Sequence, residues 1–158
     1  MKIEFVDPFV KAGYSVMESL IGEAPERGPL AMRATTFTSQ QVTIMTGVSG
    51  QVEGSVLFGM SIVTAQKIAA AMIGQPIVQM DDLAWSAISE MGNIITGNAA
   101  QLLYEAGYQC DITPPSVIRG VNIEVSTHVP ALVVPFTMKF GRLEINVALS
   151  ETAASRAA

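Results

Sequence analysis

Residues 81–107 read DDLAWSAISEMGNIITGNAAQLLYEAG, and the rest of the chain is best understood outward from this stretch. Asp81 is a suitable N-cap and Gly107 a suitable stop, and between them apolar residues recur at three- and four-residue spacing. At 1.5 Å per residue, a helix from Asp82 to Ala106 is roughly 37 Å long. The sequence therefore predicts a long helix that acts as a main strut of the domain.

Placing these residues at the angular step of an α-helix divides the predicted helix into two faces. The apolar face, which we expect to pack on the core, comprises Ala84, Trp85, Ile88, Met91, Ile95, Ala99, Leu102, Leu103 and Ala106. The opposite face comprises Ser86, Ser89, Glu90, Asn93, Thr96, Gly97, Ala100 and Gln101. Glu90 and Asn93 are i, i+3 neighbours on this second face, so their side chains are expected side by side.

The polar face has two interpretations. From the helix pattern alone, the simpler one is an ordinary solvated face that carries one acid and one amide. The composition favours the other, because solvated faces are usually built from Lys, Glu, Gln and Ala, whereas Ser, Asn, Thr and Gly each reduce helix stability. Small residues around one acid and one amide would let another surface approach the helix closely.

The segments on either side of the long helix predict an α+β fold. Before it we expect a helix over 7–22, with Asp7 as cap and Pro8 in the first turn, an antiparallel meander of strands at 32–37, 42–46 and 52–58, and a helix from Ser61 to Gly74. After it we expect strands near Ile112 and at 117–119, 123–127, 132–139 and 142–149. Strands that arrive in runs favour a mostly antiparallel sheet with a long helix and two shorter helices packed on it.

Length and composition indicate one domain. The chain has 158 residues, of which 49% are hydrophobic and 15% charged, which suits one globule with a sizeable core. No repeat or linker divides it, so we expect a single domain over 1–149 and a frayed tail over 150–158. Gly47, Gly50 and Gly54 indicate a turn and a strand bulge rather than a phosphate cradle, because no lysine follows and no helix opens there.

Charge and cysteine usage argue against several classes of function. The formal net charge is −5 and the nine Lys and Arg residues are scattered. The sequence therefore contains no basic cluster of the kind that binds nucleic acid or anionic membranes. A single Cys110 and a single His128 provide neither an intrachain disulfide nor a zinc cluster. No Walker loop or Gly-x-Ser-x-Gly elbow is present. With no signal peptide or spanning segment at the sequence level, we expect a cytoplasmic protein without membrane insertion.

The pattern Ser86-x3-Glu90-x2-Asn93, with Pro115 beyond the helix end, resembles the signature of the CheC/CheX/FliY phosphatases of bacterial chemotaxis. Supporting segments resemble CheX in order and spacing: Pro8-Phe-Val, 20–28, 47–54, Thr64-Ala65 and Met72-Ile-Gly74. The proline spacing is one residue shorter than in the family pattern, which leaves the role of Pro115 open. One copy of the motif resembles CheX rather than CheC, which carries two, because the first helix has Ile21 where a second asparagine would stand.

This resemblance implies an enzyme that hydrolyses the aspartyl phosphate of a CheY-like response regulator, with one active site per chain. It implies that Asn93 positions the attacking water and that Glu90 pairs with a lysine of the regulator. A carboxamide suits the first role because it bonds water without adding negative charge beside the phosphoryl oxygens. The regulator is expected to supply Mg²⁺, so no cofactor or metal of the chain's own is expected. Ser86, Ser89, Gly97 and Ala100 are expected to contact the partner.

Two alternatives to catalysis stay open. The same helix face could dock a receiver domain without hydrolysing its phosphate, or the chain could be an interaction domain of the flagellar-switch type. The resemblance also implies a homodimer formed through sheet edges. Residues 132–139 could supply such an edge, because Pro135 is most easily accommodated in an edge strand.

Overall fold

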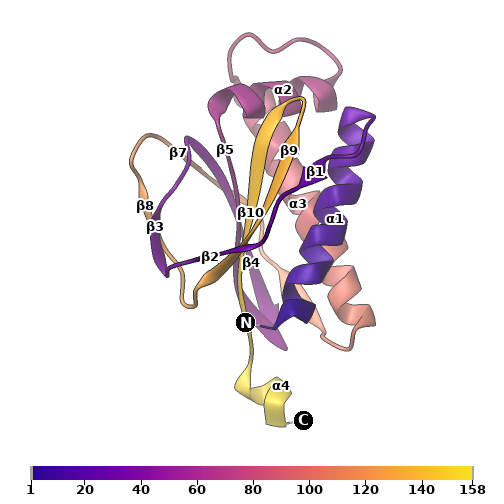
Figure 1. Ribbon diagram of the computed structural model, residues 1–158, viewed down its shortest axis with the longest axis vertical. Coiled ribbons are helices and arrows are strands. Elements are labelled where there is room, and N and C mark those ends of the chain that lie inside the picture. The colour runs from indigo at the N-terminus through magenta and orange to yellow at the C-terminus, as the bar shows by residue number, and fades with distance from the viewer. Residues whose placement is uncertain (1, 158) are drawn as a thin grey trace.

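A computed structural model describes residues 2–157 and shows an antiparallel sheet with the longer helices packed against one face, while the short C-terminal helix lies apart from it (Figure 1). The helices are α1 (Ile3–Ile21), α2 (Ile62–Ile73), α3 (Asp82–Glu105) and a short α4 (Ala153–Ala157). The first three contribute buried side chains to one hydrophobic core shared with the sheet. The α+β class expected from the sequence is confirmed.

The large sheet has the strand order β1-β9-β10-β5-β4-β6 and all its pairings are antiparallel. Its strands are β1 (Glu26–Arg27), β4 (Val42–Gly50), β5 (Val52–Met60), β6 (Cys110–Ile112), β9 (Ala131–Met138) and β10 (Gly141–Glu151). Two further strands belong to the same sheet but lie off this order: β2 (Ala31–Arg33) pairs with β9, and β7 (Ser116–Arg119) pairs with β4. A separate two-stranded ribbon joins β3 (Thr36–Thr38) to β8 (Glu124–Ser126).

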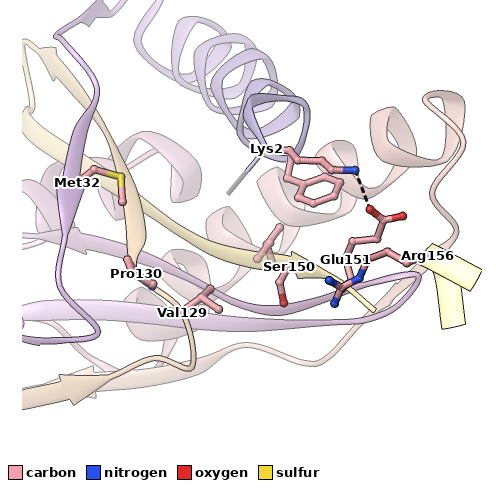
Figure 2. Close-up of a pocket in the computed structure, with 9 residues that line it drawn as sticks. Lys2, Met32, Val129, Pro130, Ser150, Glu151 and Arg156 are labelled. Carbon is pink, nitrogen blue, oxygen red and sulfur yellow. Dashed lines mark hydrogen bonds and ion pairs between the residues drawn. The ribbon is translucent and has the colours of Figure 1, made fainter. Parts of the chain in front are cut away.

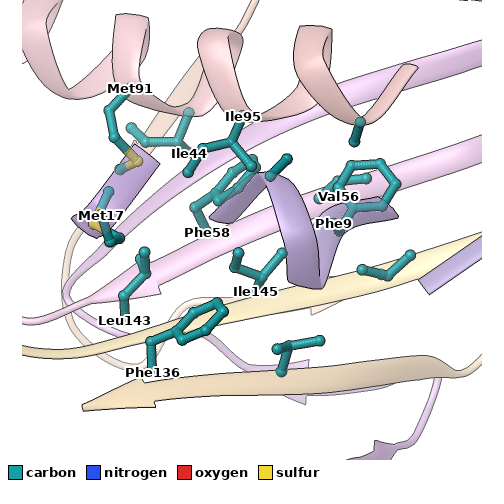
Figure 3. Close-up of a cluster of buried hydrophobic side chains, with 14 of the residues drawn as sticks. Phe9, Met17, Ile44, Val56, Phe58, Met91, Ile95, Phe136, Leu143 and Ile145 are labelled. Atoms are coloured by element: carbon teal, nitrogen blue, oxygen red, sulfur yellow. The ribbon is translucent and has the colours of Figure 1, made fainter. Parts of the chain in front are cut away.

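The core lies between the helices and the central strands (Figure 3). Alternate residues of β10 point towards the helices, as the two-residue period of a strand requires, and these include Leu143 and Ile145. They pack with Phe9 of α1 and with Met91 and Ile95 of α3 in one buried cluster. Burying an apolar side chain of this size contributes about 1.5–3 kcal/mol, so this face anchors α3 on the sheet.

The opposite face of β10 carries buried polar side chains. Arg33 donates hydrogen bonds to Asn146 Oδ1 at 2.9 Å and to Glu144 Oε2 at 3.1 Å. Arg142 Nε donates to Glu144 Oε1 at 3.1 Å, and Asn146 Nδ2 donates to the Leu57 carbonyl at 3.1 Å. The buried Glu144 and Asn146 side chains therefore both have partners, and the network ties β2 to the sheet on the side away from the helices.

Helix α1 starts earlier than predicted. It begins at Ile3 with Lys2 in the N-cap position, and Pro8 lies inside the helix rather than in its first turn. Phe5 and Val6 are both buried in the core, so packing extends the helix towards the N-terminus past the local Asp7-Pro8 signal. The predicted cap at Asp7 is wrong because tertiary burial overrides a local start signal.

The predicted meander is correct only for β4 and β5. Residues 32–37 do not form one strand, because the chain divides into β2, which pairs with β9, and β3, which pairs with β8. Both partners lie about a hundred residues away in the chain, and a local pattern carries no information on such pairing. Strand β4 also continues through Gly50, whose φ of 124° only glycine adopts readily.

The last two strands of the sheet, β9 and β10, differ from what the sequence predicts. The strand predicted over 142–149 extends through residues 150 and 151 in β10, where Glu151 pairs with Val52, and the short helix α4 follows; Ala158 lies outside the described residues. Strand β9 is not a free edge, because it pairs with β10 on one side and with β1 and β2 on the other. Pro135 lies in the gap between the β1 and β2 pairings, where no amide donor is needed.

Candidate functional site

Helix α3 has the boundaries that its sequence predicts, to within one residue. The Asp81 side chain accepts a hydrogen bond from the Ala84 amide at 2.9 Å, and the helix ends at Glu105 before Gly107, which has a φ of 100°. The cap satisfies one of the amides that a helix leaves unbonded at its N-terminus. Both ends of the strut are thus set by local chemistry.

Gly92 brings the middle of α3 close to the sheet. A Cβ at this position would lie 2.8 Å from Ile44 Cγ2 and 3.3 Å from Phe58 Cδ2, so only glycine fits without displacing the core. Gly92 lies between Glu90 and Asn93 in the sequence. It therefore determines how closely the turn that carries them approaches β4 and β5.

Two glycine substitutions in α3 should have opposite effects on stability. We expect Gly92→Ala to lower the free energy of unfolding by about 1 kcal/mol, because overpacking against Ile44 outweighs the gain in helix propensity. Gly97→Ala should raise it by about 0.5–1 kcal/mol, because a Cβ there meets only Ile112 Cδ1 at 3.9 Å. Urea denaturation of both variants measures the difference. Equal shifts in the same direction would contradict the close approach at Gly92.

Thr96 is not on the exposed face to which its sequence position assigned it. It is fully buried, its hydroxyl donates to the Gly92 carbonyl at 2.8 Å, and its oxygen lies 2.9 Å from the hydroxyl of Thr46 on β4. Position 96 lies at the margin between the two helix faces, and β4 covers that margin. The paired hydroxyl groups satisfy each other there and fix the helix against the strand.

The residues that the sequence assigned to the site are all at least partly exposed. Ser86 and Glu90 are exposed, and Ser89, Asn93, Gly97 and Ala100 are partly buried on the same side of α3. Within residues 2–157, the side-chain hydrogen bonds of this helix involve Thr96 and Gln101, and none involves the Glu90 carboxylate or the Asn93 carboxamide. The acid and the amide therefore lie one turn apart with their hydrogen-bonding atoms available to another molecule.

The side of α3 that carries Glu90 also exposes two apolar side chains that the sequence analysis did not include. Leu83 is 57% exposed and Ile94 is 38% exposed. They lie seven residues before and four residues after Glu90, which places all three on one stripe of the helix. The available signal was the presence of large apolar residues outside the core stripe.

The segment that carries Pro115 runs beside the same part of α3. The Thr113 amide donates to the Gly47 carbonyl at 2.9 Å, and Ser116 begins β7 opposite Met45. The residues between them consequently pass Thr46, whose hydroxyl contacts Thr96 of α3. This places Pro115 level with the turn of the helix that includes Asn93 and Thr96, and its role stays open.

A cleft lies elsewhere on the structure (Figure 2). It has a volume of about 400 Å³ and is lined by Lys2, Phe5, Met32, Val129, Pro130, Leu149, Ser150, Glu151 and Arg156, none of which belongs to α3. Lys2 Nζ lies 2.7 Å from Glu151 Oε2, and this hydrogen bond raises the pKa of Lys2 and lowers the pKa of Glu151. The charges of Lys2 and Glu151 thus compensate each other, and Arg156 is a third charged residue of the cleft.

Residues 2–157 contain no group of three or more His, Cys, Asp or Glu side chains arranged to hold a metal ion. Cys110 lies in β6, where partial burial raises the pKa of its thiol, and His128 lies in the loop between β8 and β9. Across the same residues, the helices are too short or too polar to cross a membrane.

A family comparison and a comparison with individual proteins point to the same family. Residues 42–137 match the family described as chemotaxis phosphatase CheX. The CheY-P phosphatase CheX of Thermotoga maritima is 31% identical over 140 residues, which cover 87% of this chain and 90% of that protein. The match to the family includes β4, α3 and β7, which together surround the candidate site.

Solved structures share the whole fold. A crystal structure of a CheX-CheY-BeF3-Mg²⁺ complex from Borrelia burgdorferi contains a chain that is 32% identical, with a TM-score of 0.78 over 95% of this chain and all of that one. A CheC-like superfamily protein from Shewanella has a TM-score of 0.84 at 22% identity, covering 95% of this chain and 99% of that one, which is a likeness of fold alone. The chain described here belongs to the CheX family of chemotaxis phosphatases.

Proposed function

We propose that this chain is a phosphatase that hydrolyses the aspartyl phosphate of a CheY-like response regulator, with one active site per chain. The observation that carries the proposal is the pairing of Glu90 and Asn93 on one accessible turn of α3, without internal hydrogen-bond partners among residues 2–157. Asn93 positions the attacking water, and Glu90 binds a lysine of the regulator. The active centre is complete only in the complex.

In this reaction a water molecule attacks phosphorus in line with the bond to the aspartate oxygen. That bond breaks, the regulator recovers its carboxylate, and inorganic phosphate leaves with the oxygen of the water. Asn93 orients the water through its carboxamide, which brings no negative charge near the phosphoryl oxygens. The regulator's Mg²⁺, when bound, neutralises charge on the transferring phosphoryl group.

Rigidity of α3 supports the positioning role. The helix is capped by Asp81, packed closely on the sheet at Gly92 and bonded to β4 through Thr96 and Thr46. Phosphoryl transfer depends mainly on placing the nucleophile and stabilising charge, so a side chain on a rigid element is well suited to it. Asn93 follows Gly92 directly, so its backbone is held in place by the same packing.

The apolar residues beside Glu90 support docking of another protein on the same face. Leu83 and Ile94 are both exposed in the free chain, although each would lose contact with water in a complex. A charged anchor between two apolar contacts matches the usual composition of a protein interface, which combines buried apolar anchors with a few polar contacts.

Replacing either apolar residue with aspartate should therefore weaken binding of the regulator. We expect Leu83→Asp and Ile94→Asp each to raise the Kd of a beryllofluoride-activated regulator about tenfold, because a carboxylate would be buried against the partner. Val78→Asp is the matched control, since Val78 is 93% exposed in the loop between α2 and α3. Titration calorimetry would contradict this interface if all three variants bound like the parent chain.

The direct test is dephosphorylation of receiver domains in multiple turnover. Each regulator is phosphorylated with labelled acetyl phosphate, freed of the donor and mixed with a small fraction of its concentration of this protein. Catalysis predicts that the label is lost much faster than by autodephosphorylation and that each chain releases many phosphate ions. Tight binding of the phosphorylated regulator without faster loss of label would instead favour a receiver-binding module, and would contradict the phosphatase.

The partners and location in this proposal follow from the same family membership. Because response regulators are intracellular signalling proteins, a cytoplasmic location is part of the proposal. A homodimer is also part of it, although β9 is already paired on both sides and another surface must form the contact. Sedimentation equilibrium of the purified chain tests the dimer.

A further inference from the structure

A shallow depression adjoins the candidate site on the side of the α3 N-terminus. It has a volume of about 410 Å³ and is lined by Asp82, Trp85 and Ser86 of α3 and by Val117 and Arg119 of β7. Ser86 lies one turn before Glu90 and belongs to both the depression and the predicted contact face. A partner that docks on Glu90 and Asn93 therefore meets the rim of this depression.

Arg119 is held in a defined position at the rim. Its Cζ atom lies 4.6 Å from the centroid of the Trp85 ring, in a cation-π contact. Its backbone is fixed on both sides, because Arg119 pairs with Val42 in the sheet and the next amide, that of Gly120, donates to the Gln41 carbonyl at 3.1 Å. A guanidinium held against an aromatic ring by a cation-π contact still has N–H groups that can donate hydrogen bonds.

Arg119 forms no ion pair with a carboxylate among residues 2–157. The ion pairs within residues 2–157 involve Lys2, Lys11, Arg33 and Arg142 as cations, and Arg119 is not among them. Asp82 lines the same depression, yet it does not form an ion pair with Arg119. The arginine is therefore preorganised to bind an acceptor that comes from outside the chain.

The edge of the sheet leaves this arginine accessible. Strand β7 pairs with β4 along one side, and no other strand of residues 2–157 pairs with its second side. Arg119 itself is exposed, as is Val117, the other β7 residue in the depression. A protein that packs on α3 can consequently reach the guanidinium without any rearrangement of this chain.

We propose that Arg119 binds a carboxylate side chain on the receiver domain of the regulator, close to its phosphorylation site, as a second charged contact of opposite sign to Glu90. The proposal rests on the proposed function, because the receiver domain is the occupant. A negative contact at Glu90 and a positive one at Arg119 define a direction along the interface. A receiver docked in reverse would bring like charges together, so the pair sets the docking register.

The test compares two charge reversals of equal size. We expect Arg119→Glu to raise the KM for the phosphorylated regulator about tenfold while kcat stays within twofold, because the contact acts in docking and not on phosphorus. Arg27→Glu makes the same charge change in β1, at the opposite end of the strand order, and should leave both constants unchanged. Arg119→Lys keeps the charge without the planar guanidinium and should fall between the two.

A second measurement keeps this inference separable from the phosphatase activity. The Kd of the beryllofluoride-activated regulator should rise about tenfold for Arg119→Glu, and replacing the matching acid on the regulator with lysine should restore binding to that variant. Unchanged affinity in Arg119→Glu, with circular dichroism showing a folded protein, would overturn the role of Arg119 whether or not the parent chain is an active phosphatase. Absent hydrolysis with intact, Arg119-dependent binding would overturn the phosphatase alone.

Discussion

Asn93→Ala is expected to reduce the rate of phosphoryl-regulator hydrolysis about a hundredfold or more while changing the Kd of the activated regulator by less than about threefold. Without the carboxamide, the water is no longer held in line with phosphorus, and the loss of one preorganised polar group in phosphoryl or acyl transfer has effects of this size. The side chain makes no hydrogen bond within residues 2–157, so its removal leaves the helix intact. Single-turnover rates at saturating phosphatase measure the chemical step directly.

Asn98→Ala is the matched control for this experiment. Asn98 lies in the same helix, is exposed, and belongs to neither the contact face nor the core. It should hydrolyse the regulator at the parent rate. If Asn93→Ala retained the parent rate, or if both variants lost activity equally, Asn93 would not position the water.

Glu90→Ala should impair both binding and turnover. We expect the Kd of the activated regulator to rise about ten- to hundredfold, because a charged hydrogen bond to a lysine is lost in a largely desolvated interface. The rate at saturation should also fall, because the helix then docks less accurately over the phosphoryl group. Stopped-flow binding and multiple-turnover hydrolysis separate the two effects.

Two controls accompany Glu90→Ala: one removes a carboxylate elsewhere in α3, and the other removes only the charge at position 90. Glu105→Ala removes a carboxylate from the far end of α3, where it accepts a hydrogen bond from Gln101 at 3.4 Å, and should bind normally. Glu90→Gln keeps the shape and loses the charge, so its Kd should lie between those of the parent and the alanine variant. A Glu90→Ala variant with parental affinity would remove the anchor from the mechanism.

Much of α3 could be read from the sequence because its signals are local. The cap at Asp81, the stop at Gly107 and the apolar period between them are set by neighbours in the chain, and the helix forms within one residue of its predicted limits. The same holds for α2, where Ser61 caps and Gly74 ends the helix as expected. The pairing of Glu90 with Asn93 on one turn follows from helical geometry alone.

Features that depend on distant contacts were missed. Thr96 was expected on the polar face and is buried, because β4 lies under the margin of the helix. Arg119 gave no signal, since its cation-π contact is with Trp85, more than thirty positions away in the chain. Residues 32–37 resemble one strand locally but divide between two partners near the other end of the chain.

The sequence by itself determined α2 and α3, the α+β class and the acid-amide motif on α3, because caps, helical period and residue spacing act over a few residues. Only the tertiary structure decided which strands pair, how closely Gly92 brings α3 to the sheet, and which side chains from other elements surround the motif. These depend on contacts between residues far apart in the chain, which are selected by burial and packing of the whole fold and leave no trace in a local pattern.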